Sequence, residues 1–212
     1  MASTDTQHPR FARLYPRIAA RADLRGAAEH RRRLVSGLAG RVIEVGAGHG
    51  ANFPHYPPTV AEVVAIEPEP TLRALATTQT AAVPVTVLPG LAEALPAADG
   101  AFDAAVVSLV LCSVDDQARA LDELRRVLRA GGELRFYEHV IPHRQPKRAL
   151  FQIADRSGAW PALAAGCHLS RDTGAAIAAA GFVIERCDRI EFRSAALEPR
   201  LSYILGSARA GG

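Results

Sequence analysis

Three glycines stand at alternate positions directly after a strand-like run. In "VIEVGAGHGAN", residues 42–52, they are Gly46, Gly48 and Gly50. Because glycine lacks a Cβ, such a loop lets a ligand come close to the main chain. A phosphate loop of the GxxxxGK[ST] type is excluded because the stretch has no lysine, and the G-x-G-x-x-G spacing of dinucleotide loops is also absent. The motif predicts a ligand-binding loop or only a tight turn, and neighbouring residues must decide.

Carboxylates stand near the ends of two predicted strands. Glu44 lies just before the glycines, and Glu67 ends the next strand-like run, "VAEVVAIEP". An acid in this second place can accept two hydrogen bonds from a ribose diol. A third polar point, "GLAEAL" at residues 90–95, follows the third run. Open α/β sheets bind ligands at the carboxyl ends of their strands, so one ribose-binding site is expected. The alternatives are surface salt bridges for Glu44 and Glu67, and a capping or solvated role for Glu93.

Strand-like and helix-like segments alternate through the middle of the chain. Strands are expected at residues 41–45, 60–68, 83–88, 101–111 and 133–140, and helices at 69–79 and 115–132. This alternation predicts an α/β, Rossmann-like fold with a parallel sheet and helices on both faces. The helix over 115–132 should be capped by Asp115 or Asp116 and ended by Gly131 and Gly132.

The end of the chain breaks this rhythm. A helix over residues 172–182 is followed by two strands, 182–192 and 201–210, with no helix between them. Two consecutive strands of this kind pair most simply as an antiparallel hairpin. We therefore expect a mostly parallel seven-stranded sheet with a terminal antiparallel hairpin at one edge.

Two further segments lie outside the alternating pattern. Residues 1–40 are predicted to form an N-terminal helical arm or lid, with Pro16 breaking its first helix and a second helix over 26–38. Residues 41–212 then form one domain, in which 142–170 are a partly helical insertion on the substrate side. The length of 212 residues, with 49% apolar and 22% charged residues, suits one domain with a small appendage.

Composition indicates the compartment. No apolar run is long enough to span a bilayer, and "MASTDTQHPR" lacks the apolar region of a signal peptide. We therefore expect a cytoplasmic protein. Cys112, Cys167 and Cys187 are widely spaced and form no CxxC motif, so reduced thiols are expected.

Arginines crowd residues 10–33, although the net charge of the chain is only +3. A solvated helix face is the first interpretation, and weak contact with an anionic membrane surface is the alternative. Nucleic-acid binding is not expected, because aromatic residues make up only 6% and do not alternate with basic ones. The sequence leaves a monomer and a homodimer equally open.

Together these segments resemble the class I S-adenosylmethionine-dependent methyltransferases. The likeness rests on "VIEVGAGHG", "AIEPEP", "GLAEALPAADGAFDAAVVS" and "LDELRRVLRAGGELRFYE", which cover about residues 41–140. It implies S-adenosyl-L-methionine as cofactor and S-adenosyl-L-homocysteine as product. It also implies a cofactor-binding set made of Glu44, Gly46, Ala47, Gly48, Gly50, Asn52, Glu67, Pro68, Leu91, Ala92, Glu93, Ser108 and Leu109.

The resemblance assigns a part of the cofactor to each group. Glu44 and its neighbouring backbone would hold the methionine end, and Glu67 would take the ribose hydroxyls. Leu91 stands where many relatives have an aspartate. Adenine recognition would then rest on backbone groups and on Glu93.

A narrower likeness is to the methyltransferase-like-seven family. It is carried by "GANFPHYPPTVAEVVAIEPEP", "LVLCSVDDQARALDELRRVLRAGG", "YEHV" and "GCHLSRDT", over about residues 43–173. Members of that family methylate alkyl thiols and hydrogen sulfide, so the resemblance implies a thiol S-methyltransferase. Its animal members carry an apolar membrane anchor where this sequence has arginines, and localisation therefore does not carry over.

The acceptor determines how much acid–base chemistry is needed. A thiol with a pKa of about 8.5 is partly ionised at cytosolic pH, whereas an alcohol needs a dedicated base. His139 in "YEHV" is the candidate base, and Cys112 is the second catalytic candidate. A structural histidine and packing cysteines are the alternatives. The substrate-binding residues are expected to be Tyr15, Trp160, Cys167 and His168.

Other chemistries stay open or are set aside. A zinc site made of Cys112, His139, His143 and Cys167 is not predicted, because the spacing is not that of a zinc motif. Methylation of oxygen, nitrogen or carbon in a quinone-like or specialised metabolite is the enzymatic alternative. A cofactor-binding module without catalysis and a peripheral surface binder are the non-enzymatic ones.

Overall fold

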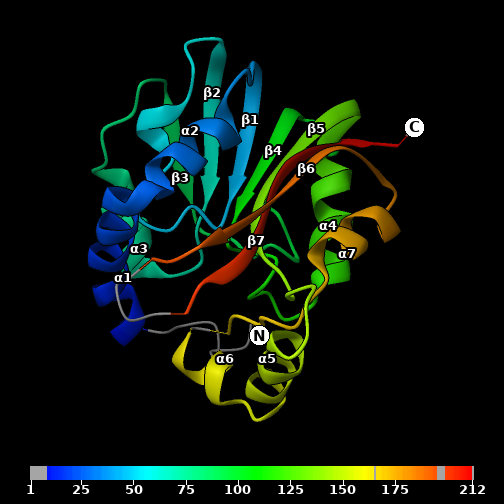
Figure 1. The fold of residues 1–212 in the computed structure, drawn as a ribbon. Coiled ribbons are helices and arrows are strands. Elements are labelled where there is room, and N and C mark those ends of the chain that lie inside the picture. Colours follow the sequence, from blue (N-terminus) through cyan, green and yellow to red (C-terminus); the bar gives the residue numbers. More distant parts are fainter. Residues whose placement is uncertain (1–8, 165, 195–198, 212) are drawn as a thin grey trace.

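A computed structural model of the chain describes residues 9–164, 166–194 and 199–211. Its centre is a seven-stranded sheet in the order β3-β2-β1-β4-β5-β7-β6 (Figure 1). The strands are β1 (Gly40–Val45), β2 (Val60–Ile66), β3 (Val85–Leu88), β4 (Phe102–Ser108), β5 (Leu128–His139), β6 (Phe182–Phe192) and β7 (Leu201–Ala210). Strands β1 to β5 pair in parallel, and β7 pairs antiparallel with both β5 and β6. The predicted α/β fold with its antiparallel hairpin is confirmed.

Helices cover both faces of the sheet. They are α1 (Pro9–Ala22), α2 (Ala28–Val35), α3 (Pro70–Thr77), α4 (Gln117–Val127), α5 (Lys147–Arg156), α6 (Ala159–Leu163) and α7 (Thr173–Ala179). α4 and α7 pack on one face through Leu121 and Ile177, and α2 and α3 pack on the other through Leu34 and Ala76. α5 and α6 lie beyond the carboxyl ends of the parallel strands (Figure 1). In the described part of the chain, no helix combines the length and apolarity that a membrane span requires.

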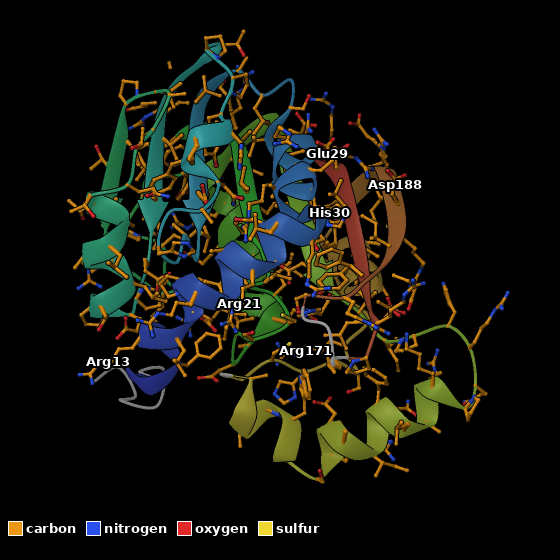
Figure 2. All side chains as sticks on the ribbon, turned by 60° about the vertical axis from the view of Figure 1, so that its left-hand side comes forward. Arg13, Arg21, Glu29, His30, Arg171 and Asp188 are labelled. Carbon is orange, nitrogen blue, oxygen red and sulfur yellow. The ribbon has the colours of Figure 1, made fainter. Side chains whose placement is uncertain are left out.

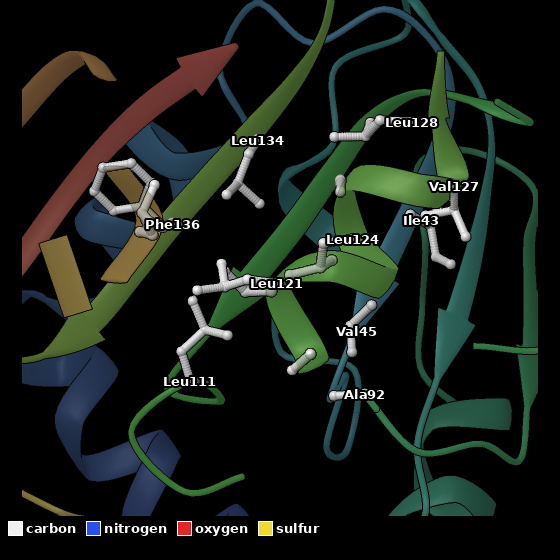
Figure 3. Packing of buried hydrophobic residues seen from close by; sticks show 14 of the residues in the cluster. Ile43, Val45, Ala92, Leu111, Leu121, Leu124, Val127, Leu128, Leu134 and Phe136 are labelled. Carbon is white, nitrogen blue, oxygen red and sulfur yellow. The ribbon is translucent and has the colours of Figure 1, made fainter. Parts of the chain in front are cut away.

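The apolar pattern of helix α4 determines which face of the helix packs on the sheet. Leu121, Leu124 and Val127 recur at helical spacing and therefore share one face. They are at most 1% exposed and pack with strand residues such as Phe136 (Figure 3). Asp116 caps the helix by accepting a hydrogen bond from the Arg119 N–H at 3.0 Å. The cap thus falls on the second of the two predicted aspartates.

The predicted end of this helix was wrong. α4 ends at Val127, and Leu128 already pairs with Phe102 as the first residue of β5. Leu128 is buried in the core and extended at ψ 137°, which takes the backbone out of the helix before the glycines. Gly131 and Gly132 therefore lie within the range of β5.

The predicted break in the arm was also misplaced. α1 continues through Pro16, and the kink lies in a π-helical turn, Asp23–Ala27, where Gly26 has a φ of 121°. Glycine adopts this conformation at little steric cost, whereas the packing of the inner face of α1 outweighs the one hydrogen bond that proline removes. The second helix, α2, is shorter than the predicted range 26–38.

Candidate active site

The glycine motif forms a tight loop at the carboxyl end of β1. The N–H groups of Gly46 and Ala47 donate to the Ile66 carbonyl at 2.8 and 3.1 Å, which ties the loop to the end of β2. Gly46 has a φ of 68°, and a Cβ there would lie 2.4 Å from the Val110 side chain. Only glycine lets the loop pack this closely against the segment that follows β4.

Glu67 directly follows β2 and is 5% exposed. Its Oε2 accepts a hydrogen bond from the Gly48 N–H at 2.7 Å, and its Oε1 accepts one from the Glu69 N–H at 2.9 Å. Burial raises the pKa of Glu67, and these two N–H groups oppose the rise. The neighbouring Pro68 carbonyl accepts from Arg73 at 3.0 Å. Glu67 thus holds the glycine loop, and its remaining lone pairs can accept further hydrogen bonds.

A buried polar network lies next to this loop. Glu44, 1% exposed, accepts hydrogen bonds from the Asn52 side-chain amide at 2.9 Å and the Tyr56 hydroxyl at 2.7 Å. The Asn52 carbonyl oxygen accepts from Nη1 of Arg31 at 3.3 Å, and Nε of Arg31 pairs with Asp23 at 3.1 Å. Arg31 is itself only 5% exposed. The network therefore brings a cation from α2 to the end of β1.

The protonation of Glu44 should shape the pH dependence of stability. Burial raises the pKa of Glu44 from 4.5 to about 7, despite hydrogen bonds from Tyr56 and Asn52 that lower it. Between these two pH values the folded state holds the proton more tightly than the unfolded chain. The free energy of unfolding therefore falls by roughly 3 kcal/mol as pH rises from 4.5 to about 7. We expect Glu44→Gln to remove this loss, as measured by urea unfolding from pH 4.5 to 7.5.

Glu29→Gln is the matched control for this experiment, because Glu29 is an exposed carboxylate on α2. The difference in unfolding free energy between parent and Glu44→Gln should change with pH, whereas the difference for Glu29→Gln should stay small. A Glu44→Gln curve parallel to that of the parent would contradict a proton-holding Glu44.

Tyr15 of α1 lies against the glycine loop. Its ring would be 3.3 Å from a Cβ placed on Gly48, and it meets the His49 ring edge-on with centroids 5.6 Å apart. Burial raises the pKa of Tyr15, and the charge of Arg31 lowers it. The structure thus places Tyr15 on the loop itself, and its predicted contact with a substrate stays a prediction.

The residues predicted to frame an adenine follow β3. Ala92 is buried, and Leu91 forms an isolated bridge. The Glu93 carboxylate accepts hydrogen bonds from the N–H groups of Asp115 and Asp116 at 3.1 and 3.4 Å. Glu93 therefore stabilises the turn before α4, which is the capping alternative. A further role of these residues toward adenine stays a prediction.

β4 ends in a strained turn that a buried acid holds in place. Ser108 is the last residue of β4, and Leu109 has a φ of 62°, the one positive value outside glycine in the described residues. Glu138 of β5 is 0% exposed, and its oxygens accept from the N–H groups of Val110 at 2.9 Å and Cys112 at 3.2 Å. Burial raises the pKa of Glu138, and these N–H groups oppose the rise. Glu138 thereby fixes the position of Cys112.

Two thiols and one imidazole meet where β4 and β5 end. Nδ1 of His139 lies 3.3 Å from Sγ of Cys167 and 3.9 Å from Sγ of Cys112. Both cysteines are buried. The hydrogen bond with Cys167, together with burial, raises the pKa of the Cys112 thiol well above its usual range. The fold thus brings together three of the predicted site residues, whereas His143 is exposed and lies outside this cluster.

The remaining predicted residues come from the insertion. Nδ1 of His168 lies 3.0 Å from a carboxylate oxygen of Asp155 on α5, and its main-chain N–H donates to the Cys112 carbonyl at 2.7 Å. Trp160 packs against the apolar cluster that contains both buried cysteines. These contacts tie the insertion to the loop after β4. Contact of Trp160 and His168 with a substrate stays a prediction.

Some buried polar atoms have no hydrogen-bond partner among the described residues. They are Nδ1 of His49, Oγ of Ser108, Nε2 of His139 and Nε1 of Trp160. Buried polar atoms almost always find a partner in folded proteins. Since the first three belong to the glycine loop and to the ends of β4 and β5, they indicate a polar ligand at the carboxyl edge of the sheet.

Comparison with known proteins decides the family. A family profile described as "Methyltransferase domain" matches residues 43–136. A demethylmenaquinone methyltransferase of Renibacterium salmoninarum is 31% identical over 180 residues, which cover 76% of this chain and 75% of that protein. The chain belongs to the class I S-adenosylmethionine-dependent methyltransferases. Its fold agrees with a solved SAM-dependent methyltransferase of Thermotoga maritima, described as a possible histamine N-methyltransferase. The TM-score is 0.70 at 21% identity, over 95% of this methyltransferase and 97% of that chain.

A human relative is similar over a shorter stretch. Thiol S-methyltransferase TMT1A of Homo sapiens is 37% identical over 147 residues, which cover 66% of this methyltransferase and 59% of the human protein. This methyltransferase therefore matches about three-fifths of the length of that relative.

The family implies S-adenosylmethionine, and the observed site fits it. At Gly48 the Tyr15 ring lies over the main chain, so that a Cβ there would come within 3.3 Å of it. The unpartnered Nδ1 of His49 and Oγ of Ser108 lie in the glycine loop and at the end of β4. A ligand with hydroxyl, amine and carboxylate groups can satisfy both.

Two residues of this site were absent from the sequence predictions. Arg31 shares one face of α2 with Leu34 and Val35, at spacings of three and four, and this apolar face was the available signal. This face was not recognised, because other arginines stand on both sides of Arg31 in the sequence. Glu138 follows the buried Phe136 and Tyr137 near the end of a strand, and a buried carboxylate in such a place needs several donors.

Proposed function

We propose that this methyltransferase transfers the methyl group of S-adenosylmethionine to the sulfur of a small thiol. The observation that carries the proposal is the environment of the His139 imidazole. The hydrogen-bond partners of this ring in the described structure are two thiols and no carboxylate. An alcohol needs a strong, oriented base, whereas a thiol ionises close to neutral pH. The similarity to human thiol S-methyltransferase TMT1A supports the same class of acceptor.

The residues of the chain would hold the cofactor at several points. Arg31, oriented by Asn52, is suited to bind its carboxylate, and Glu44, in the same network, would help to hold its methionine end. Glu67 has lone pairs for the ribose hydroxyls. When bound, the cofactor supplies an electrophilic methyl group. The remaining positions in this proposed set are Gly46, Ala47, Gly48, Gly50, Pro68, Leu91, Ala92, Glu93, Ser108 and Leu109.

Catalysis then depends mainly on aligning the acceptor with the methyl group. The acceptor sulfur must be held in line with the methyl group in a pocket that excludes water. We place His139 and Cys112 beside the acceptor, with Trp160, Cys167 and His168 on the insertion side. The acceptor would lose its thiol proton to solvent, and its sulfur would bond to the methyl carbon as the bond from that carbon to the cofactor sulfur breaks. No covalent bond to the protein is required.

We further propose that α1 covers the glycine loop, with residues 142–170 forming the substrate side. Replacing Tyr15, whose ring lies over Gly48, tests the cover. Tyr15→Ala is expected to lower turnover about tenfold, because water then enters the pocket. Tyr15→Phe keeps the ring and should stay close to the parent in steady-state assays. Equal turnover of the alanine variant and the parent would exclude the cover.

A second candidate acceptor is the carbon or oxygen of a quinone-like compound. The similarity to demethylmenaquinone methyltransferase favours it. A cofactor-binding module would instead retain the cofactor without turnover.

Methyl transfer from labelled S-adenosylmethionine distinguishes these functions. A panel of small thiols is assayed, each beside the alcohol and the amine of the same carbon skeleton. We expect label in the thiols alone, with Glu67→Ala as the background control. Label in alcohols, amines or a quinone precursor would overturn the thiol proposal and leave the family standing.

The exposed surface of α1 relates to the predicted contact with a membrane. Arg13, Arg17 and Arg21 are exposed, and so are Leu14 and Ile18; Figure 2 shows Arg13 and Arg21 on the outside of this helix. Weak contact with an anionic membrane surface stays a prediction, and binding to anionic vesicles that disappears with added salt would support it. The cytoplasmic location and the choice between monomer and homodimer also stay predictions.

A further inference from the structure

The donor atoms of Cys112, His139 and Cys167 form a compact triangle. Their two sulfur atoms and the Nδ1 nitrogen all lie within 4.8 Å of one another. A sulfur and a nitrogen ligand of a tetrahedral zinc site lie about 3.6 Å apart, as follows from zinc–sulfur bonds of about 2.3 Å and zinc–nitrogen bonds of about 2.0 Å. The sulfur–nitrogen separations of 3.3 and 3.9 Å fall on either side of this value. Small side-chain adjustments therefore suffice to place a zinc ion between them.

The three donors are held by separate parts of the fold. Glu138 anchors the main chain at Cys112, and His139 ends a strand of the central sheet. The segment after Cys167 returns to the same place, because Arg171 donates to the Leu111 carbonyl at 2.8 Å. Figure 2 shows Arg171 between the sheet and the insertion helices. The cluster is thus positioned in advance rather than assembled from a flexible loop.

One tautomer of the His139 imidazole also suits a metal. With its proton on Nε2, His139 presents the Nδ1 lone pair to the two sulfur atoms, which is the tautomer that a metal requires. Two thiolates and a neutral imidazole balance the charge of Zn²⁺. Three protein ligands leave the fourth tetrahedral position open, which is the pattern of catalytic rather than structural zinc sites.

We propose that Cys112, His139 and Cys167 bind Zn²⁺, and that the open position takes the sulfur of the acceptor thiol. The second half of this proposal rests on the proposed thiol methylation. Zinc binding releases one proton from each cysteine, and binding of the acceptor releases its thiol proton to solvent. The acceptor sulfur then forms its bond to the methyl carbon as the bond from that carbon to the cofactor sulfur breaks. The thioether product is a weaker zinc ligand than a thiolate and leaves.

The metal is tested on the full chain, kept reduced and free of chelators. Zinc content is measured by elemental mass spectrometry, and cobalt is substituted to reveal bonds to thiolate by their charge-transfer absorption. We expect about one equivalent of metal per chain and a thiolate–cobalt band. Cys112→Ser and Cys167→Ser should each lose most of the metal. Cys187→Ser, at an exposed cysteine on β6, is the matched control and should keep it.

Circular dichroism and binding of S-adenosylhomocysteine show whether each serine variant is folded. A parent without zinc, a cobalt spectrum without the thiolate band, or a disulfide between Cys112 and Cys167 in the reduced preparation would each overturn the site. Methylation of thiols by a zinc-free parent would overturn it while the proposed function stands. Zinc binding without thiol methylation would keep the metal site and remove the acceptor from its fourth position.

Discussion

Replacing Glu67 by alanine is expected to weaken the binding of S-adenosylhomocysteine by about 1,000-fold, or roughly 4 kcal/mol. Two effects add. In the proposed binding mode the ribose would lose two hydrogen bonds to a charged acceptor, and the Gly48 N–H loses the carboxylate that holds the glycine loop. Isothermal titration calorimetry measures the affinity directly, without the complication of turnover.

Glu62→Ala is the matched control for this variant. Glu62 lies on β2, the strand that Glu67 follows, and its carboxylate pairs with Arg41 at the surface. Its loss should leave the affinity unchanged. An unchanged affinity in Glu67→Ala, with the fold intact, would remove Glu67 from the ribose role.

Replacing Arg31 by methionine is expected to weaken cofactor binding by between about 100- and 1,000-fold. The buried guanidinium is the one cation that the described network places beside Asn52 and Glu44. Without this guanidinium, the carboxylate of the ligand would face the side chains of Glu44 and Asp23 with no compensating positive charge. Calorimetry with S-adenosylhomocysteine again gives the result.

Removing the buried Arg31 also leaves Asp23 without its ion-pair partner. The melting temperature of the variant is therefore measured as well, to show that it is folded. Arg31→Lys keeps the charge but loses the planar fork, and an intermediate affinity is expected. Arg32→Met, at the exposed neighbour paired with Glu29, should bind like the parent. A folded Arg31→Met variant with parental affinity would contradict the proposed carboxylate site.

The sequence was most informative at the terminal hairpin. The last two strands were predicted to the residue, because each is bounded by breaks in the apolar pattern. The glycine loop and Glu67 were placed together for a topological reason. Parallel strands bring their carboxyl ends to one edge, whatever the details of packing.

Other features depended on contacts that no local pattern contains. α1 passes through Pro16 because its inner face is packed, and α4 ends at Val127 because Leu128 joins the sheet. A zinc site at the thiol–imidazole cluster was not predicted, because the spacing along the chain is not that of a zinc motif. Its members come from three segments that only the fold brings within reach, Cys112, His139 and Cys167.

An acceptor that offers both a thiol and a hydroxyl group shows which atom is methylated. A short mercapto-alcohol is incubated with labelled S-adenosylmethionine and the methyltransferase, and the product is assigned by nuclear magnetic resonance. We expect a single S-methyl thioether with a free hydroxyl group. An O-methyl ether with a free thiol would contradict this expectation.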